Sequence, residues 1–95
     1  MPYHVVVSDD VRDFLRSLDP KSRGICKKNL AKLALPYPGR GSGDKERIVV
    51  AGEEVYRLHI GRTYTAFYVI DERMKLVRVI EVLPIEAAHK KYGYR

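Results

Sequence analysis

The sequence predicts an α+β domain in which one strand and a helical hairpin precede a meander of antiparallel strands. Residues 3–7 alternate and are rich in valine, as in a strand. Residues 8–34 repeat apolar side chains at helical spacing, and residues 47–83 hold short β-branched and aromatic runs separated by turn residues. Helices on one face of such a sheet leave its other face free to carry a site. The 95 residues suffice for a single domain, residues 1–95, with one modest core.

The first helix is expected to begin at Ser8. Serine is a good N-cap, and the acids Asp9 and Asp10 then favour the helix dipole. Apolar residues at i, i+3, i+4 and i+7 mark its buried face: Val11, Phe14, Leu15 and Leu18. Asp19-Pro20 ends this helix and suits the start of the next, because aspartate caps a helix and proline fits its first turn.

The second helix has an apolar stripe of its own, formed by Cys26, Leu30, Leu33 and Ala34. Its basic residues fall largely away from that stripe, among them Lys27, Lys28 and Lys32. The two helices are therefore predicted to form a hairpin with a basic outer face. Cys26 is the only cysteine, so it forms no internal disulfide and is expected to be a small buried residue.

Pro36, Pro38 and three glycines predict a loop over residues 36–46. Strands then follow over residues 47–50, 55–60, 63–70 and 75–83, with turns at 51–54, 61–62 and 71–73. Pro84 closes the last strand, and the tail after it forms either a short helix or a strap across the sheet.

The strand over residues 55–60 carries two basic side chains on one face. Because successive side chains alternate between faces, Arg57 and His59 lie together, and Tyr56, Leu58 and Ile60 lie on the opposite face. The apolar set suits the helix-covered side, which turns Arg57 and His59 outward. In the next strand both faces are largely apolar, so periodicity leaves open which of them is exposed.

The formal net charge of +6 is concentrated in two places. Residues 19–47 hold eight Lys or Arg against three acids, a net +5, and residues 84–95 hold three against one, a net +2. Such an excess suits a polyanionic partner such as RNA, or an acidic protein, and equally suits a soluble surface.

Several classes of protein are disfavoured by composition. No stretch is long and apolar enough to span a bilayer, and the N-terminus lacks a signal pattern, so a cytoplasmic protein is expected. One cysteine and three histidines show no zinc spacing. The chain has no glutamine, one asparagine and 32% charged residues, a composition that fits a thermophilic source.

Two segments carry a family resemblance: VVVSDDVRDFLRSL near the start, and VYRLHIGRTYTAFYVIDERMKLVRVIEVLP later. The sequence resembles the RelE/ParE superfamily of small bacterial and archaeal toxins of type II toxin–antitoxin systems, with the same order of elements over almost the whole chain. The phrase YRLHIG before RTYTAFYVID matches the family's hairpin. The resemblance implies a helical hairpin packed on a curved antiparallel sheet, a RelE-like fold.

The favoured RelE branch implies an endoribonuclease that cuts messenger RNA in the ribosome and inhibits translation, with no metal or other cofactor. The ribose 2′-hydroxyl attacks the neighbouring phosphorus, which requires groups that move the proton and stabilise the phosphate charge. On this resemblance Arg57 clamps the phosphate, His59 holds the RNA or carries the proton, and Tyr92 stacks on a base or transfers a proton. The expected RNA-binding residues are Arg62, His89, Lys90, Lys91, Lys27, Lys28 and Lys32.

The sequence departs from the family at two positions. Thr65 stands where the family usually has an arginine, and Ile85 stands where a basic residue is common after the last strand. Arg62 in the turn, and His89 and Tyr92 three apart in the tail, are the candidate substitutes.

Other functions stay open beside the RNase. The ParE branch acts on DNA gyrase and lacks the catalytic basic set, and an inactive relative would serve only as a protein-binding module. Each would have a cognate antitoxin, an acidic and partly disordered chain that folds on binding, and oligomers would form through it. Arg57 and His59 would then be an exposed basic pair, balanced by one of three acids: Glu53, Glu54 or Glu81.

Overall fold

The computed structural model describes residues 2–38 and 43–92, apart from the side chain of Tyr92. Its elements follow in chain order: β1 (His4–Val7), α1 (Asp9–Ser17), α2 (Pro20–Leu30), the 3-10 helix η1 (Ala31–Ala34), β2 (Lys45–Val50), β3 (Glu53–Ile60), β4 (Tyr64–Asp71), β5 (Leu76–Pro84) and α3 (Ile85–Tyr92). The predicted order of elements is confirmed, and the tail forms a helix.

The five strands form one mixed sheet in the order β1-β5-β4-β3-β2. Strands β2 to β5 pair antiparallel with their neighbours in sequence, as predicted, whereas β1 pairs parallel with β5. The register of β4 and β5 shifts between Phe67 and Tyr68, which leaves Ile80 as the extra residue of a β-bulge. A bulge increases the local twist of a sheet and therefore contributes to its curvature.

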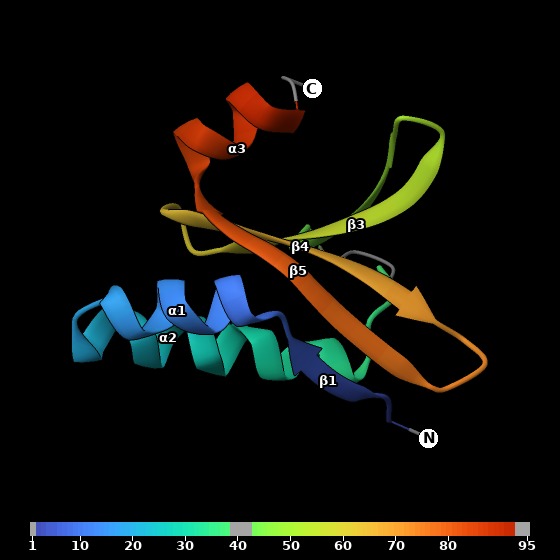
Figure 1. Ribbon diagram of the computed structural model, residues 1–95, viewed down its shortest axis with the longest axis horizontal. Helices are drawn as coiled ribbons and strands as arrows, with labels where there is room; N and C mark the ends of the chain where they lie inside the picture. Colours follow the sequence, from blue (N-terminus) through green and yellow to red (C-terminus); the bar gives the residue numbers. More distant parts are fainter. Residues whose placement is uncertain (1, 39–42, 93–95) are drawn as a thin grey trace.

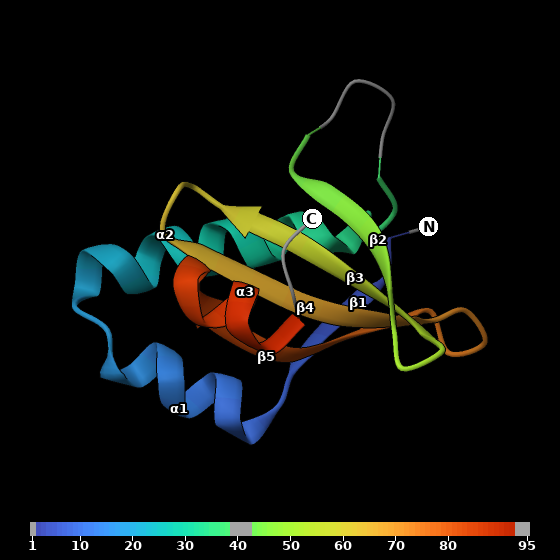
Figure 2. The same ribbon diagram turned by 90° about the horizontal axis from the view of Figure 1, so that it is seen from above.

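Helices cover both faces of the sheet. The hairpin of α1 and α2 lies against one face, and α3 lies on the other (Figure 1). Viewed from above, α3 crosses over β4 and β5 (Figure 2). The sequence-based expectation of an open second face is therefore wrong in part, because the tail folds back onto it.

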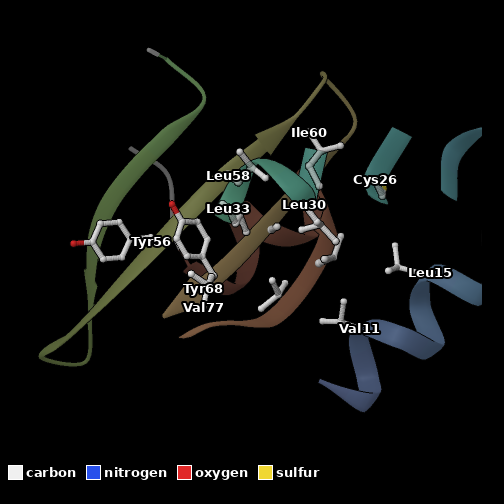
Figure 3. Packing of buried hydrophobic residues seen from close by; sticks show 13 residues of the cluster. Val11, Leu15, Cys26, Leu30, Leu33, Tyr56, Leu58, Ile60, Tyr68 and Val77 are labelled. Carbon is white, nitrogen blue, oxygen red and sulfur yellow. The ribbon is translucent and has the colours of Figure 1, made fainter. Parts of the chain in front are cut away.

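The main hydrophobic core lies between the hairpin and the sheet. Figure 3 shows residues of this core, among them Leu30 of α2, Leu33 of η1 and Leu58 of β3, and all three are buried. From the predicted stripe of α1, Val11 and Leu15 are buried and Phe14 and Leu18 are partly buried. The stripe of α1 is thus confirmed as a surface that holds the hairpin on the sheet. Of the second stripe, Cys26, Leu30 and Leu33 lie in the core, whereas Ala34 is only half-buried, and α2 ends at Leu30 so that Leu33 and Ala34 fall in η1.

Both helices of the hairpin begin at a side chain that accepts a hydrogen bond from the first turn. The Ser8 hydroxyl accepts from the Val11 N–H at 3.2 Å, and the Asp19 carboxylate accepts from the Ser22 N–H at 3.1 Å, so both predicted N-caps are confirmed.

The turn between β2 and β3 is shorter than predicted. It consists of Ala51 and Gly52 alone, both with positive φ (51° and 82°), so Val50 and Glu53 already pair. Positive φ at both central residues matches the twist of the flanking strands and permits a two-residue hairpin loop. The predicted turn over residues 51–54 was therefore too long. The predicted loop over residues 36–46 was also too long, because β2 begins at Lys45.

Removing the Tyr68 hydroxyl is expected to destabilise the fold. This hydroxyl is buried and donates to the Pro36 carbonyl at 2.5 Å, which ties the chain before β2 to the core. Tyr68→Phe leaves that carbonyl without its partner and should lower the free energy of unfolding by about 1–3 kcal/mol, measured by urea denaturation at neutral pH.

Alkaline pH provides a second test of the same hydroxyl. Burial, with smaller effects of Tyr56 and Asp44, raises the pKa of Tyr68 well above its ordinary value of 10.0. Above about pH 10 the unfolded state therefore releases a proton that the folded state retains, so stability falls as pH rises. This loss should be smaller in Tyr68→Phe, and equal slopes of stability against pH in both proteins would contradict the assignment.

Candidate functional site

The face of the sheet that bears α3 also bears Arg57 and His59. Their neighbours on β3 belong to the core under the hairpin, so the two basic side chains lie on the opposite side, as predicted. The register places Arg57 between Glu46 of β2 and Phe67 of β4, and places Phe67 opposite Glu81 of β5. These four residues form one row across the sheet, which we call the Arg57 row.

Arg57 is held by a carboxylate of the neighbouring strand. Its Nη2 donates to Glu46 Oε1 at 2.7 Å, and its side chain is only 11% exposed, against 44% for Glu46. Nε of Arg57 is buried and has no hydrogen-bond partner within residues 2–38 and 43–92. An unsatisfied buried donor costs about 1–3 kcal/mol, so the guanidinium keeps unused donor capacity beside its ion pair.

The acid that balances Arg57 differs from the three acids expected from sequence. Glu46 takes this role because the β2–β3 register sets it opposite Arg57. Glu54 pairs instead with Arg47 at 3.1 Å, where both side chains are more than half exposed.

His59 lies two residues after Arg57 on β3. It is half-buried, and its backbone N–H donates to the Asp44 carbonyl at 2.8 Å. Thr65 of β4 lies opposite and is only 4% exposed. The position at which the resemblance predicts an arginine is thus occupied by a buried threonine, which adds no charge.

Both faces of β4 are largely covered, which answers the question that periodicity left open. Ala66 and Tyr68 are buried beneath the hairpin, while Phe67 is buried on the other side with Val55 and Ala88 of α3. Both faces of β4 are largely apolar because both are covered, so polarity could not identify an exposed face.

Helix α3 brings part of the basic tail to the same face. Lys91 Nζ lies 2.8 Å from Glu81 Oε2, at the far end of the Arg57 row from Glu46. His89 is half-buried and Lys90 is exposed. Tyr92 is the last residue of α3, and its side chain lies outside the described residues.

The lysines predicted on the hairpin lie on the other side of the sheet from Arg57. Lys27 and Lys28 are exposed on α2, and Lys32 of η1 lies 3.9 Å from Asp44. The structure therefore does not bring these three lysines together with Arg57 and His59. Any role in RNA binding would require a ligand large enough to reach both faces.

Arg62 is exposed in the turn between β3 and β4. That turn also contacts the start of α3, because the Ile85 N–H donates to the Thr63 carbonyl at 3.0 Å. Arg62 thus lies in the turn that contacts the first residue of α3.

Within the part of the chain that the structure describes, no group of three or more His, Cys, Asp or Glu side chains is placed to hold a metal ion. Over the same residues, no helix has the length and apolar character needed to cross a membrane.

No protein-family profile and no curated protein matches the sequence. Solved structures match it well. A chain of the archaeal RelE–RelB complex from Pyrococcus horikoshii OT3 is 21% identical, with a TM-score of 0.70 over 88% of this chain and 96% of that one. A chain of the RelBE2 toxin–antitoxin complex from Mycobacterium tuberculosis is 19% identical, with a TM-score of 0.70 over 86% and 96%. A mutant of the E. coli toxin RelE in the free state is 20% identical, with a TM-score of 0.59 over 98% and 95%.

This chain has the RelE fold. Its two departures from the RelE/ParE sequence pattern can now be placed, because Thr65 is buried on β4 and Ile85 is the first residue of α3. The α3-bearing face nevertheless carries basic groups, among them Arg57 and His59 of β3 and Lys91 of α3.

Sequence analysis missed Glu46 as a member of this face of the RelE fold. Glu46 fell in the predicted loop, so it had no strand register. A two-residue turn at Ala51 and Gly52 could have identified Glu46, because such a turn sets Glu46 across from Arg57. Opposite charges at those positions are a favourable cross-strand pair.

Proposed function

We propose that this protein is the toxin of a toxin–antitoxin pair and that it cleaves messenger RNA on the ribosome. The observation that carries this proposal is a RelE fold with Arg57 and His59 at alternate positions of one strand, on the same face. The basic excess of the chain supports a polyanionic target.

In the proposed reaction the ribose 2′-oxygen bonds to phosphorus, and the bond from phosphorus to the 5′-oxygen of the next nucleotide breaks. Arg57 binds the phosphate oxygens, because a guanidinium is planar and always charged. His59 takes the 2′-hydroxyl proton, as an imidazole does near neutral pH. The leaving 5′-oxygen gains a proton, and the products carry a 2′,3′-cyclic phosphate and a 5′-hydroxyl.

The tail and the β3–β4 turn hold the RNA in this proposal. Lys91 and Lys90 on α3, with Arg62 in the turn, supply phosphate contacts that position the strand without reading its sequence. Tyr92 stacks on a base, and His89 contributes a further polar contact.

The proposed partner is a cognate antitoxin, since solved chains with this fold occur in RelE–RelB and RelBE complexes. An acidic chain that folds on binding suits a protein with a net charge of +6. Expression of the chain alone should arrest growth, and co-expression of an acidic protein encoded beside it should restore growth. Normal growth with folded protein present would overturn the assignment as a toxin.

The nuclease is tested by primer extension on messenger RNA in translating ribosomes, with purified antitoxin-free protein. Cuts within the decoding site, with 2′,3′-cyclic phosphate ends, are the expected result. Folded protein that binds ribosomes without producing cuts would overturn the nuclease.

A non-nuclease toxin that acts on DNA gyrase is the second candidate. The observation in its favour is that the guanidinium of Arg57 already pairs with Glu46. In addition, Thr65 and Ile85 carry no charge. A supercoiling assay separates the two, because an RNase leaves gyrase activity unchanged and a gyrase-directed toxin abolishes it.

Glu46 is expected to restrain phosphate binding at Arg57. Its carboxylate lies 2.7 Å from the guanidinium and cancels much of the field that attracts a phosphate. Glu46→Gln keeps the shape of the side chain and removes its charge. It should tighten binding of a short uncleavable RNA by about tenfold, since unit charges 4 Å apart interact by about 1–4 kcal/mol between bulk water and the protein surface.

Glu54→Gln is the matched control, because Glu54 pairs with Arg47 across the same two strands in an exposed ion pair. It should leave RNA affinity unchanged. Equal affinities of Glu46→Gln and the wild type would show that Glu46 does not restrain Arg57.

A further inference from the structure

Arg78 differs from the other arginines of the described strands in having no partner. Arg47 pairs with Glu54 and Arg57 pairs with Glu46. Arg78 is exposed near the start of β5, and its side chain makes no hydrogen bond or ion pair to any residue in the ranges 2–38 and 43–92. Its charge is therefore not used within the described fold.

Arg78 lies on the same face of the sheet as Arg57. The register sets it between Val6 of β1 and Val69 of β4, and Val69 packs with the apolar cluster on the α3-bearing face. Its neighbours along β5, Val77 and Val79, point the other way into the core under the hairpin. Its guanidinium thus extends the basic surface of β3 toward the edge of the sheet at β1.

The surroundings of Arg78 are apolar and open. Val6 is 43% exposed and Ile80, the extra residue of the β-bulge, is 39% exposed. Together with Arg78 they line a shallow depression of about 190 Å³. A cation beside exposed aliphatic side chains fits a nucleotide, because its phosphate meets the charge and its sugar and base cover the apolar surface.

We propose that Arg78 binds a backbone phosphate of single-stranded RNA, separate from the phosphate at Arg57. The two arginines lie two strands and about two residues apart, which strand spacing and rise convert to about 12 Å between their backbones. One phosphate group does not bridge that separation, so the RNA runs across β4 from β3 to β5. The path rests on the proposed function, whereas binding at Arg78 is measurable without cleavage.

The test is a fluorescence-anisotropy titration of the full chain with a labelled 2′-O-methyl RNA of about 12 nucleotides, within the site size of single-strand binders. The 2′-O-methyl group prevents the 2′-oxygen from attacking, so binding is measured alone. Wild type, Arg78→Ala, Arg78→Lys and Arg73→Ala are compared over a range of salt concentrations. Arg73 is exposed in the β4–β5 turn and serves as the control for loss of one surface charge.

Arg78→Ala should weaken RNA binding about tenfold, the effect of losing a hydrogen-bonded charge contact. The slope of log affinity against log salt should become shallower by about 0.7, the value for one phosphate of a single strand. Arg78→Lys should retain most of the slope, because it keeps the charge, and Arg73→Ala should match the wild type.

Three results would overturn this inference: an unchanged slope in Arg78→Ala, an equal loss in Arg73→Ala, or a glutamate-rich peptide that binds more tightly than RNA and depends on Arg78. The last result would assign the surface to an acidic protein partner. If the salt slope becomes shallower in Arg78→Ala but the wild type cleaves no RNA, the RNA contact is supported and only the proposed nuclease activity is contradicted. Cleavage without the slope change would contradict only the contact.

Discussion

Arg57→Ala is expected to reduce cleavage of ribosome-bound messenger RNA by about 100- to 1,000-fold, the scale of a removed transition-state donor. The physical reason is the loss of a guanidinium that shares the α3-bearing face with His59. Single-turnover rates from primer extension provide the measurement. Arg57→Lys should fall between the wild type and Arg57→Ala, because it keeps the charge and loses the planar donor fork.

Arg47→Ala is the control for Arg57→Ala. Arg47 lies on the neighbouring strand, opposite Tyr56, and its ion pair with Glu54 is exposed. Its loss should leave the rate within about twofold, since exposed ion pairs contribute little. A cleavage rate of folded Arg57→Ala within the same range would remove Arg57 from the reaction and move the chemistry to α3.

Phe67→Ala is expected to lower the free energy of unfolding by about 3–5 kcal/mol, as for other fully buried phenylalanines. Phe67 is buried at the centre of the Arg57 row and packs with Val55 and Ala88. Its ring is therefore part of what holds α3 on the sheet. Urea denaturation measures the loss, and hydrogen exchange should show that α3 amides lose protection before those of the central strands.

Phe14→Ala is the matched control, because Phe14 is only partly buried and contacts Tyr64 edge to face at 5.8 Å between ring centroids. It should cost clearly less stability and leave α3 protected. A loss in Phe67→Ala no larger than in Phe14→Ala would show that α3 is held mainly by its other contacts, such as Lys91 with Glu81.

Much of the fold was predictable because its signals are local. The two N-caps, Ser8 and Asp19, and the apolar stripes that follow them placed both helices correctly. The parallel pairing of β1 with β5 was not predicted. Residues more than 60 positions apart meet there, and no periodicity within either strand records the direction of its partner.

The candidate site was predictable only where the positions of its residues follow from the geometry of a single strand. Arg57 and His59 share a face because side chains alternate, and the structure bears this out. The predicted partner of Arg57 was wrong, because the pairing of Arg57 with Glu46 depends on the register between β2 and β3. Arg78 was not singled out at all, because the lack of a side-chain partner for it among the described residues depends on all of its neighbours together.

The sequence by itself determined the order of elements, the two helical faces that become core, and the shared face of Arg57 and His59. These features follow from spacing within one element, where the chain has little conformational choice. Tertiary structure alone decided that α3 lies over that face, that Glu46 holds Arg57, and that Lys27, Lys28 and Lys32 lie on the opposite side. Those outcomes depend on which distant surfaces bury each other, and many segments of similar polarity compete for that role until the whole chain packs.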